Sequence, residues 1–225
     1  MRASWRYEAA AASVRAATRT SSLAPTEESG RHACCNVAPV FGFLNAVAVT
    51  GSLASPSRCA ELGRIMLRAL EREHAFQSSL LEIAHLARPL GQTLHRGEAA
   101  RELDRALETV ECADVLVLVA PLRRGSLPGL FKHFIDLLNP EALRGVPVLV
   151  GTTGRNAEQQ LVIENAILPV VSALGACAIE TTLFATDSTV RDDLQERASI
   201  AAKRAMAELR PSGRMLRHQL AAQIC

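Results

Sequence analysis

The residue types best suited to binding a charged ligand gather in one short stretch, GSLASPSRC, which runs from Gly51 to Cys59. It follows a run of small and apolar residues and leads directly into apolar residues at helical spacing. Hydroxyls and an arginine therefore meet at the start of a predicted helix, whose unpaired N–H groups and partial positive charge attract anions. We expect a phosphate here: Ser52, Ser55 and Ser57 can donate from their hydroxyls, Arg58 adds a full charge, and Ser52, Ser57 and Arg58 are the predicted site residues. Serine-rich loops that only cap a helix are commoner, so the loop alone leaves both interpretations open.

A second candidate loop, Pro121 to Gly129, follows the apolar run Val115 to Val119. That run is too short for a typical globular helix and is rich in β-branched residues, which predicts a strand buried on both faces. Pro121 ends it, and apolar residues return at helical spacing after Pro128. Open α/β sheets bind their ligands where such a loop leaves the carboxyl end of a strand.

A third loop has the sequence Gly151-Thr152-Thr153-Gly154 and follows the buried strand predicted at Val148 to Val150. Glycines let a ligand approach the backbone closely, and the backbone N–H groups can donate to it. Taken by itself, however, this loop is better explained as an ordinary turn between a strand and a helix.

The elements that position these loops alternate between strand and helix, which predicts an α/β flavodoxin-like, doubly wound, five-stranded parallel sheet of order 2-1-3-4-5. The predicted strands are Phe43–Thr50, a strand within 77–86, the run from Val115, Val148–Val150 and Ala176–Phe184. The predicted helices include 98–111, 158–173 with a kink at Pro169, and 190–209. Since the first loop lacks the GxGxxG pattern, a dinucleotide-binding Rossmann site is not expected.

The predicted domain organisation has three parts: a disordered N-terminal extension over 1–42, the α/β domain over 43–210 and a basic tail over 211–225. The extension is rich in Ala, Ser, Thr and Arg. Its composition also fits an organellar transit peptide or an extension added by a mistaken start codon.

Composition excludes several classes of function. The 225 residues are 48% hydrophobic and carry a formal net charge of +2, so a core is expected and a nucleic-acid-binding face is not. No apolar run approaches the roughly 20 residues of a membrane span. The six cysteines form no CxxC pairs and have no histidines at zinc-like spacing. We therefore expect no metal site, free thiols and a cytoplasmic location. No nucleophile elbow or carboxylate cluster indicates hydrolysis.

The second loop and its helix, PLRRGSLPGLFKHFIDLL, closely resemble a segment of the NAD(P)H-dependent FMN reductases that serve sulfonate-utilisation monooxygenases. Two residues depart from that pattern, since Arg123 and Leu127 stand where the family has tyrosines. In the family this loop holds the flavin ring. The resemblance therefore assigns the ring to Pro121, Leu122, Arg123, Arg124, Gly125 and Ser126.

The other two loops resemble the same family. The first matches its flavin-phosphate loop at Pro56, Ser57 and Arg58, with Cys59 in place of a serine or threonine. The third resembles the family's Ala-Thr-Gly-Gly loop, with Thr153 in place of a glycine. The resemblance thus adds Cys59 to the phosphate site and assigns the pyrimidine edge of the flavin to Thr152, Thr153 and Gly154.

The activity that the resemblance implies is hydride transfer from NADPH or NADH to FMN, with reduced flavin supplied to a flavin-dependent monooxygenase. No catalytic acid or base is needed, because the cofactor carries the chemistry. A homodimer or homotetramer is expected. The alternatives are a quinone, azo-dye or metal-ion reductase and a non-enzymatic flavodoxin-type electron carrier, although a pI near 8.3 does not supply the acidic face typical of such carriers.

Overall fold

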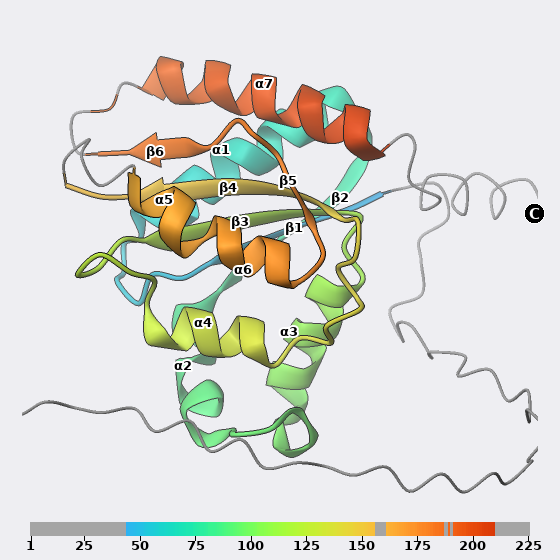
Figure 1. Cartoon of the computed structure of the whole chain (residues 1–225), viewed down its shortest axis with the longest axis vertical. Coiled ribbons are helices and arrows are strands. Elements are labelled where there is room, and N and C mark those ends of the chain that lie inside the picture. The colour runs from blue at the N-terminus through green and yellow to red at the C-terminus, as the bar shows by residue number, and fades with distance from the viewer. Residues whose placement is uncertain (1–43, 156–160, 187–188, 190, 210–225) are drawn as a thin grey trace, which may run out of the picture. The chain divides into compact units, whose positions relative to one another are not determined.

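A parallel β-sheet lies at the centre of the fold, with helices on both faces (Figure 1). The computed structural model describes residues 44–155, 161–186, 189 and 191–209. The strands are β1 Leu44–Thr50, β2 Phe76–Glu82, β3 Val115–Pro121, β4 Pro147–Thr153, β5 Cys177–Ala178 and β6 Leu183–Ala185. Their order is β2-β1-β3-β4-β5, with β6 also paired to β4, and every pairing between these strands is parallel. The predicted flavodoxin-like order 2-1-3-4-5 is confirmed, with a sixth strand added.

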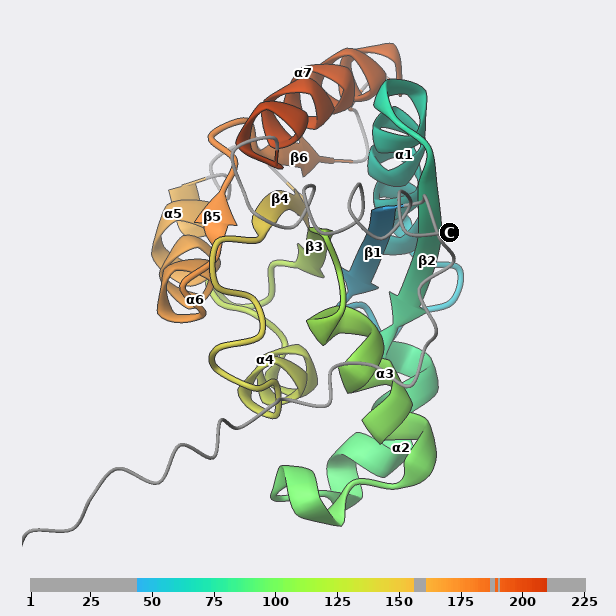
Figure 2. The ribbon, with the colours of Figure 1, turned by 90° about the vertical axis from the view of Figure 1, so that its right-hand side faces the viewer.

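The helices divide between the two faces of the sheet (Figure 2). Helices α1 (Arg58–Glu73) and α7 (Arg191–Leu209) cover one face. The other face is covered by α3 (Arg101–Glu111), α4 (Gly129–Asp136), α5 (Leu161–Ala166) and α6 (Leu168–Ala173), while α2 (Ile83–Gln92) packs against α3 and α4. A short 3-10 helix, Arg96–Glu98, lies between α2 and α3.

The central position of β3 in the sheet explains why its sequence is almost entirely apolar. Val115, Val117 and Val119 contact the cluster under α1 and α7, whereas the residues between them join the cluster on the opposite face. Alternate side chains of a strand point to opposite faces, so a central parallel strand must be apolar at every position. The prediction of a strand buried on both faces is confirmed, and it fixes the loop after β3 at the carboxyl edge.

Arg96 links α3 to the end of α4. Its guanidinium donates to Asp104 Oδ1 (2.9 Å), to Glu111 Oε1 (2.6 Å) and to the carbonyl of Leu137 (3.3 Å). Glu111 Oε1 also accepts from the backbone N–H of Asn139 (2.7 Å). These bonds hold the carboxyl end of α4, whose amino end begins in the second candidate loop.

Three predicted elements differ in the structure. The strand expected within 77–86 ends at Glu82, and 83–92 form α2 in spite of Pro89. Ile83, Leu86 and Leu90 recur at helical spacing, and burying them against α3 and α4 outweighs the hydrogen bond that proline removes.

The single strand expected over Ala176–Phe184 is instead β5 and β6, which pair with the two ends of β4. The helix expected over 158–173 is divided at Ile167, because Pro169 lies in the first turn of α6 and favours a new helix start there. Residues 158–160, Phe43, the expected extension over 1–42 and the expected tail over 211–225 lie outside the described residues.

Among the residues that the structure describes, no helix is both long and apolar enough to cross a membrane.

Candidate functional site

Three loops meet at the carboxyl edge of the sheet, where β1, β3 and β4 end. The backbone N–H of Gly51 donates to the carbonyl of Val119 (2.8 Å), and that of Leu122 donates to Thr153 (3.0 Å). The N–H of Gly154 donates to the carbonyl of Ala185 (3.0 Å) at the end of β6. The sheet pairing therefore continues into all three loops and holds them together.

The first loop ends in a capped helix. The Ser57 hydroxyl accepts from the backbone N–H of Ala60 (3.2 Å), which makes Ser57 the N-cap of α1. A hydroxyl that accepts one bond keeps its own proton for a ligand. Arg58 is the first helical residue and is exposed, while Ser52 is buried and accepts from the N–H of Ala54 (3.1 Å). Positive charge, hydroxyls and a helix amino end thus occur together, as predicted.

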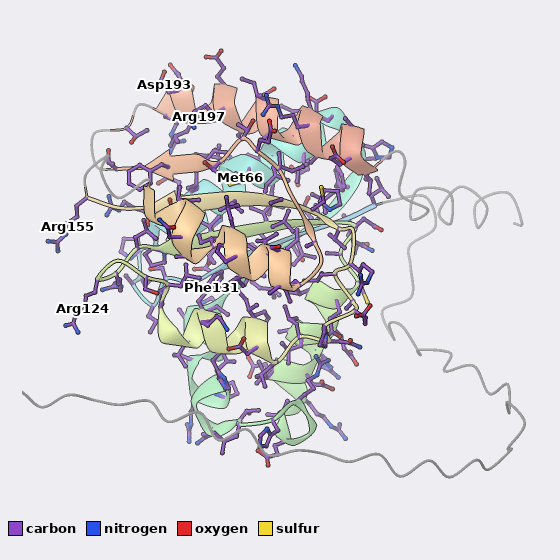
Figure 3. The ribbon with its side chains drawn as sticks, in the orientation of Figure 1. Met66, Arg124, Phe131, Arg155, Asp193 and Arg197 are labelled. Carbon is purple, nitrogen blue, oxygen red and sulfur yellow. The ribbon has the colours of Figure 1, made fainter. Side chains whose placement is uncertain are left out.

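Gly51 lets the first loop lie directly against α4. A Cβ atom added at Gly51 would come within 2.8 Å of Cγ and Cδ2 of Phe131, a ring that is fully buried. Figure 3 shows Phe131 in the interior beneath this edge. Only glycine permits this approach, so the start of the first loop is set by the packing of α4.

The second loop contains a tight turn. Arg123 and Ser126 exchange two backbone hydrogen bonds of 3.0 Å, and the residues between them, Arg124 and Gly125, have φ of 51° and 74°. Two successive positive φ values are typical of the two-residue turns of hairpins. Leu122 is buried and Pro121 half-buried, whereas the four residues of the turn are exposed. The turn therefore rises from the sheet as a defined projection.

The third loop begins in the buried part of β4. Thr152, Thr153 and Gly154 are buried, and Arg155 is exposed. Thr152 Oγ1 is buried without a hydrogen-bond partner in the structure. Figure 3 shows Arg155 and Arg124 projecting from the same side of the molecule, one from the third loop and one from the second.

A buried side-chain contact joins the first loop to the third. Cys59 Sγ lies 3.1 Å from Thr153 Oγ1, and both residues are almost fully buried. Burial raises the pKa of Cys59, and the Thr153 hydrogen bond and the positive charges of Arg58 and Arg123 offset part of that rise. The thiol is therefore neutral at physiological pH, and it lies near arginines from two different loops.

The thiols of Cys59 and Cys177 are both free. Cys112 is disulfide-bonded, which contradicts the expectation of free thiols for that residue, because spacing along the chain cannot show which sulfurs meet in space.

Alkylation should distinguish Cys59 from Cys177. At pH 8, iodoacetamide is expected to modify half-buried Cys177 in the native protein but to reach Cys59 only after unfolding, because Cys59 is 1% exposed. Burial raises the pKa of both thiols, so the expected difference comes from exposure. Peptide mass spectrometry after timed quenching measures both rates. Modification of Cys59 at the rate of Cys177 would show that the contact with Thr153 opens readily.

The donor set fits a phosphate and a planar, polar ring. The charged residues described in the three loops are all arginines: Arg58, Arg123, Arg124 and Arg155. Arg58 lies beside the hydroxyls of the first loop and the amino end of α1. The other three arginines lie in the turn of the second loop or directly after the third loop. Within the described part of the chain, no group of three histidine, cysteine or acidic side chains could hold a metal ion. The residues present therefore suit a phosphorylated flavin.

Sequence reasoning missed two contacts of the site, the Phe131 ring against Gly51 and the pair formed by Cys59 and Thr153. Nothing in the spacing of these residues indicates that they touch. A hollow of about 610 Å³ lies elsewhere, between β2, α2 and α3, and is lined by Leu81, His85 and Arg105 among others. None of the thirteen predicted site residues lines it.

Known proteins of one family are similar to this chain. The family model described as NADPH-dependent FMN reductase matches residues 44–190. The chain is 36% identical over 168 residues to the NADH-dependent FMN reductase SfnF of Pseudomonas fluorescens, covering 72% of this chain and 90% of that protein. It is 34% identical over 165 residues to an FMN reductase (NADPH) of Pseudomonas aeruginosa, covering 71% of this chain and 89% of that protein.

A solved structure, that of an oxidoreductase from Corynebacterium diphtheriae, aligns with a TM-score of 0.68 at 22% identity, covering 76% of this chain and 98% of that chain. At this level of identity the alignment supports the fold. The matched segment begins at β1 and extends past β6, so it contains all three loops of the candidate site. The chain therefore belongs to the NADPH-dependent FMN reductase family.

Proposed function

We propose that this protein is an NAD(P)H-dependent FMN reductase whose flavin lies on the three loops at the carboxyl edge of the sheet. One observation carries the assignment of the site. The phosphate-type loop at the start of α1 and the loops after β3 and β4 are hydrogen-bonded to one another or to adjoining strands, so they are held together at one edge of the sheet. The family of the chain supplies the reaction.

The first loop would hold the phosphate group. The Ser57 proton, the backbone N–H groups at the start of α1 and the Arg58 guanidinium all favour a dianion there, with Ser52 and Cys59 beside them. Because Ser57 is fixed by its own capping bond, it needs little reordering to receive the ligand.

The flavin ring would lie against the second and third loops. Residues 121–126 form one side, with Pro121 and Leu122 near the sheet and the turn from Arg123 to Ser126 above them. Thr152, Thr153 and Gly154 form the other side and would lie beside the polar edge of the ring. When bound, FMN supplies the redox chemistry by accepting hydride from the nicotinamide, so these residues have to orient the ring and exclude water.

Steady-state oxidation of NADH and of NADPH, followed at 340 nm with FMN, riboflavin or a quinone as acceptor, tests the function. We expect FMN to be the best of the three acceptors. A quinone reduced faster than either flavin would favour the alternative of a quinone reductase. A protein that binds FMN but oxidises neither nicotinamide would favour an electron carrier.

We further propose that the reduced flavin is delivered to a flavin-dependent monooxygenase, and that the chain assembles as a homodimer or homotetramer in the cytoplasm. The delivery to a monooxygenase follows from the sequence resemblance to reductases that serve sulfonate-utilisation monooxygenases. Oxygenase turnover supported by this reductase and NAD(P)H tests the first point. Sedimentation at micromolar concentration tests the second.

Arg123 is expected to raise the midpoint potential of bound FMN. Its positive charge lowers the pKa of Cys59, inside the site, and it stands where the sequence resemblance expects a tyrosine. A positive charge near the ring stabilises the negative charge of the reduced flavin. Arg123→Tyr should therefore lower the potential, by roughly 30 mV for each 1.4 kcal/mol of stabilisation lost in a two-electron couple.

Redox titration of the FMN-loaded protein measures that shift. Arg88→Ala, which removes an exposed arginine of α2, is the control and should leave the potential unchanged. If Arg123→Tyr leaves the potential of FMN unchanged but alters the oligomeric state, the arginine serves a subunit contact instead.

A further inference from the structure

Thr153 is bonded to both of the other loops of the site. Its backbone carbonyl accepts from the N–H of Leu122 (3.0 Å), at the base of the second loop. Its hydroxyl lies 3.1 Å from the sulfur of Cys59, in the first turn of α1. One buried residue therefore connects the loop proposed for the phosphate with the loops proposed for the ring.

The Cys59 contact is buried and specific. Cys59 is 1% exposed and Thr153 is 4% exposed, so water does not compete for the bond between them. Cys59 follows the N-cap Ser57 by two residues, so the position of its sulfur is tied to the position of the helix start.

We propose that Cys59 and Thr153 act as a pair of positioning residues that fixes the start of α1 relative to the end of β4, and thereby sets the affinity for FMN. This inference rests on the proposed function. FMN would be held at two points, by its phosphate at α1 and by its ring at β3 and β4. A ligand that is held at two points binds most tightly when the protein already holds those two points at the right separation. Binding then does not have to order the two loops relative to each other. Riboflavin has no phosphate and depends on the ring loops alone.

Thr153→Val removes the hydroxyl with little change of shape, and Cys59→Ala removes the sulfur. Each is expected to raise the dissociation constant of FMN about three- to tenfold, the usual range for one lost hydrogen bond, and to change that of riboflavin less than twofold. Cys59→Ser restores a hydroxyl partner and should bind FMN nearly as well as the native chain. Cys177→Ala, which removes a free thiol outside the three loops, is the matched control.

Titration of flavin fluorescence in the full chain gives all these constants. In the double variant, adding Thr153→Val to Cys59→Ala should raise the dissociation constant of FMN less than twofold further, because the two residues act through one contact. Independent, multiplicative effects would overturn the proposal. So would variants that lower the thermal midpoint while leaving the ratio of FMN to riboflavin affinity unchanged. Failure of the native chain to bind FMN would overturn the proposed function as well, whereas native binding with an unchanged ratio would overturn this inference alone.

Discussion

Replacing Ser57 and Arg58 together with alanine is expected to weaken FMN binding roughly ten- to hundredfold, and riboflavin binding far less. Both residues lie at the start of α1, where a phosphate dianion would receive a hydroxyl proton, the helix N–H groups and a guanidinium. A charge-assisted bond of this kind is worth about 1.5–3 kcal/mol. Riboflavin lacks the dianion, so its affinity reports only on the ring loops.

Fluorescence titration with each flavin measures the difference. Arg68→Ala, in the same helix about 15 Å further along, is the control and should change neither affinity. Since Ser57 also caps α1, its loss lowers stability by about 1 kcal/mol, and the single variant Arg58→Ala separates the phosphate contact from the cap. Equal losses of affinity for FMN and riboflavin would show that the phosphate does not bind at this loop.

Gly51→Ala is expected to lower the free energy of unfolding by about 1–3 kcal/mol and to weaken the binding of both flavins. The new methyl would lie 2.8 Å from the Phe131 ring, closer than carbon atoms can approach. Because Phe131 is fully buried in α4, the ring cannot turn away, and the first loop would have to move. Urea denaturation measures the stability of the flavin-free protein.

Gly129→Ala gives the matched control, since a Cβ at that position, the first residue of α4, would meet nothing within 4 Å. It should leave the free energy of unfolding unchanged or slightly raised. Adding Phe131→Leu to Gly51→Ala should recover part of the flavin affinity by making room for the methyl group. If the free energy of unfolding of Gly51→Ala equals that of the native chain, the first loop does not pack closely against α4.

Local sequence signals correctly predicted the parts of the fold that depend on one segment at a time. The unbroken apolar run of β3 reflects burial on both faces, and Ser57 precedes an amphipathic helix, so both elements could be placed without knowing their neighbours. Alternation of strand and helix then gave the sheet order, and with it the edge at which the three loops meet.

The remaining features depend on contacts between distant segments. Pro89 signals the end of a helix, yet α2 continues through it because α3 and α4 bury its apolar side. The break between β5 and β6 depends on how each pairs with β4. Cys59 and Thr153 are 94 residues apart, and neither residue type indicates the other as its partner.

Hydrogen exchange with and without FMN tests most directly whether the three loops hold the flavin. Saturating FMN is expected to slow amide exchange in peptides covering 51–58, 121–127 and 152–155, and to leave β2, α2 and α3 unchanged, because ligand contacts suppress local opening. Riboflavin should slow exchange in the second and third segments but protect 51–58 much less. Protection confined to the hollow between β2, α2 and α3, or absent from the three loops, would contradict the proposed site.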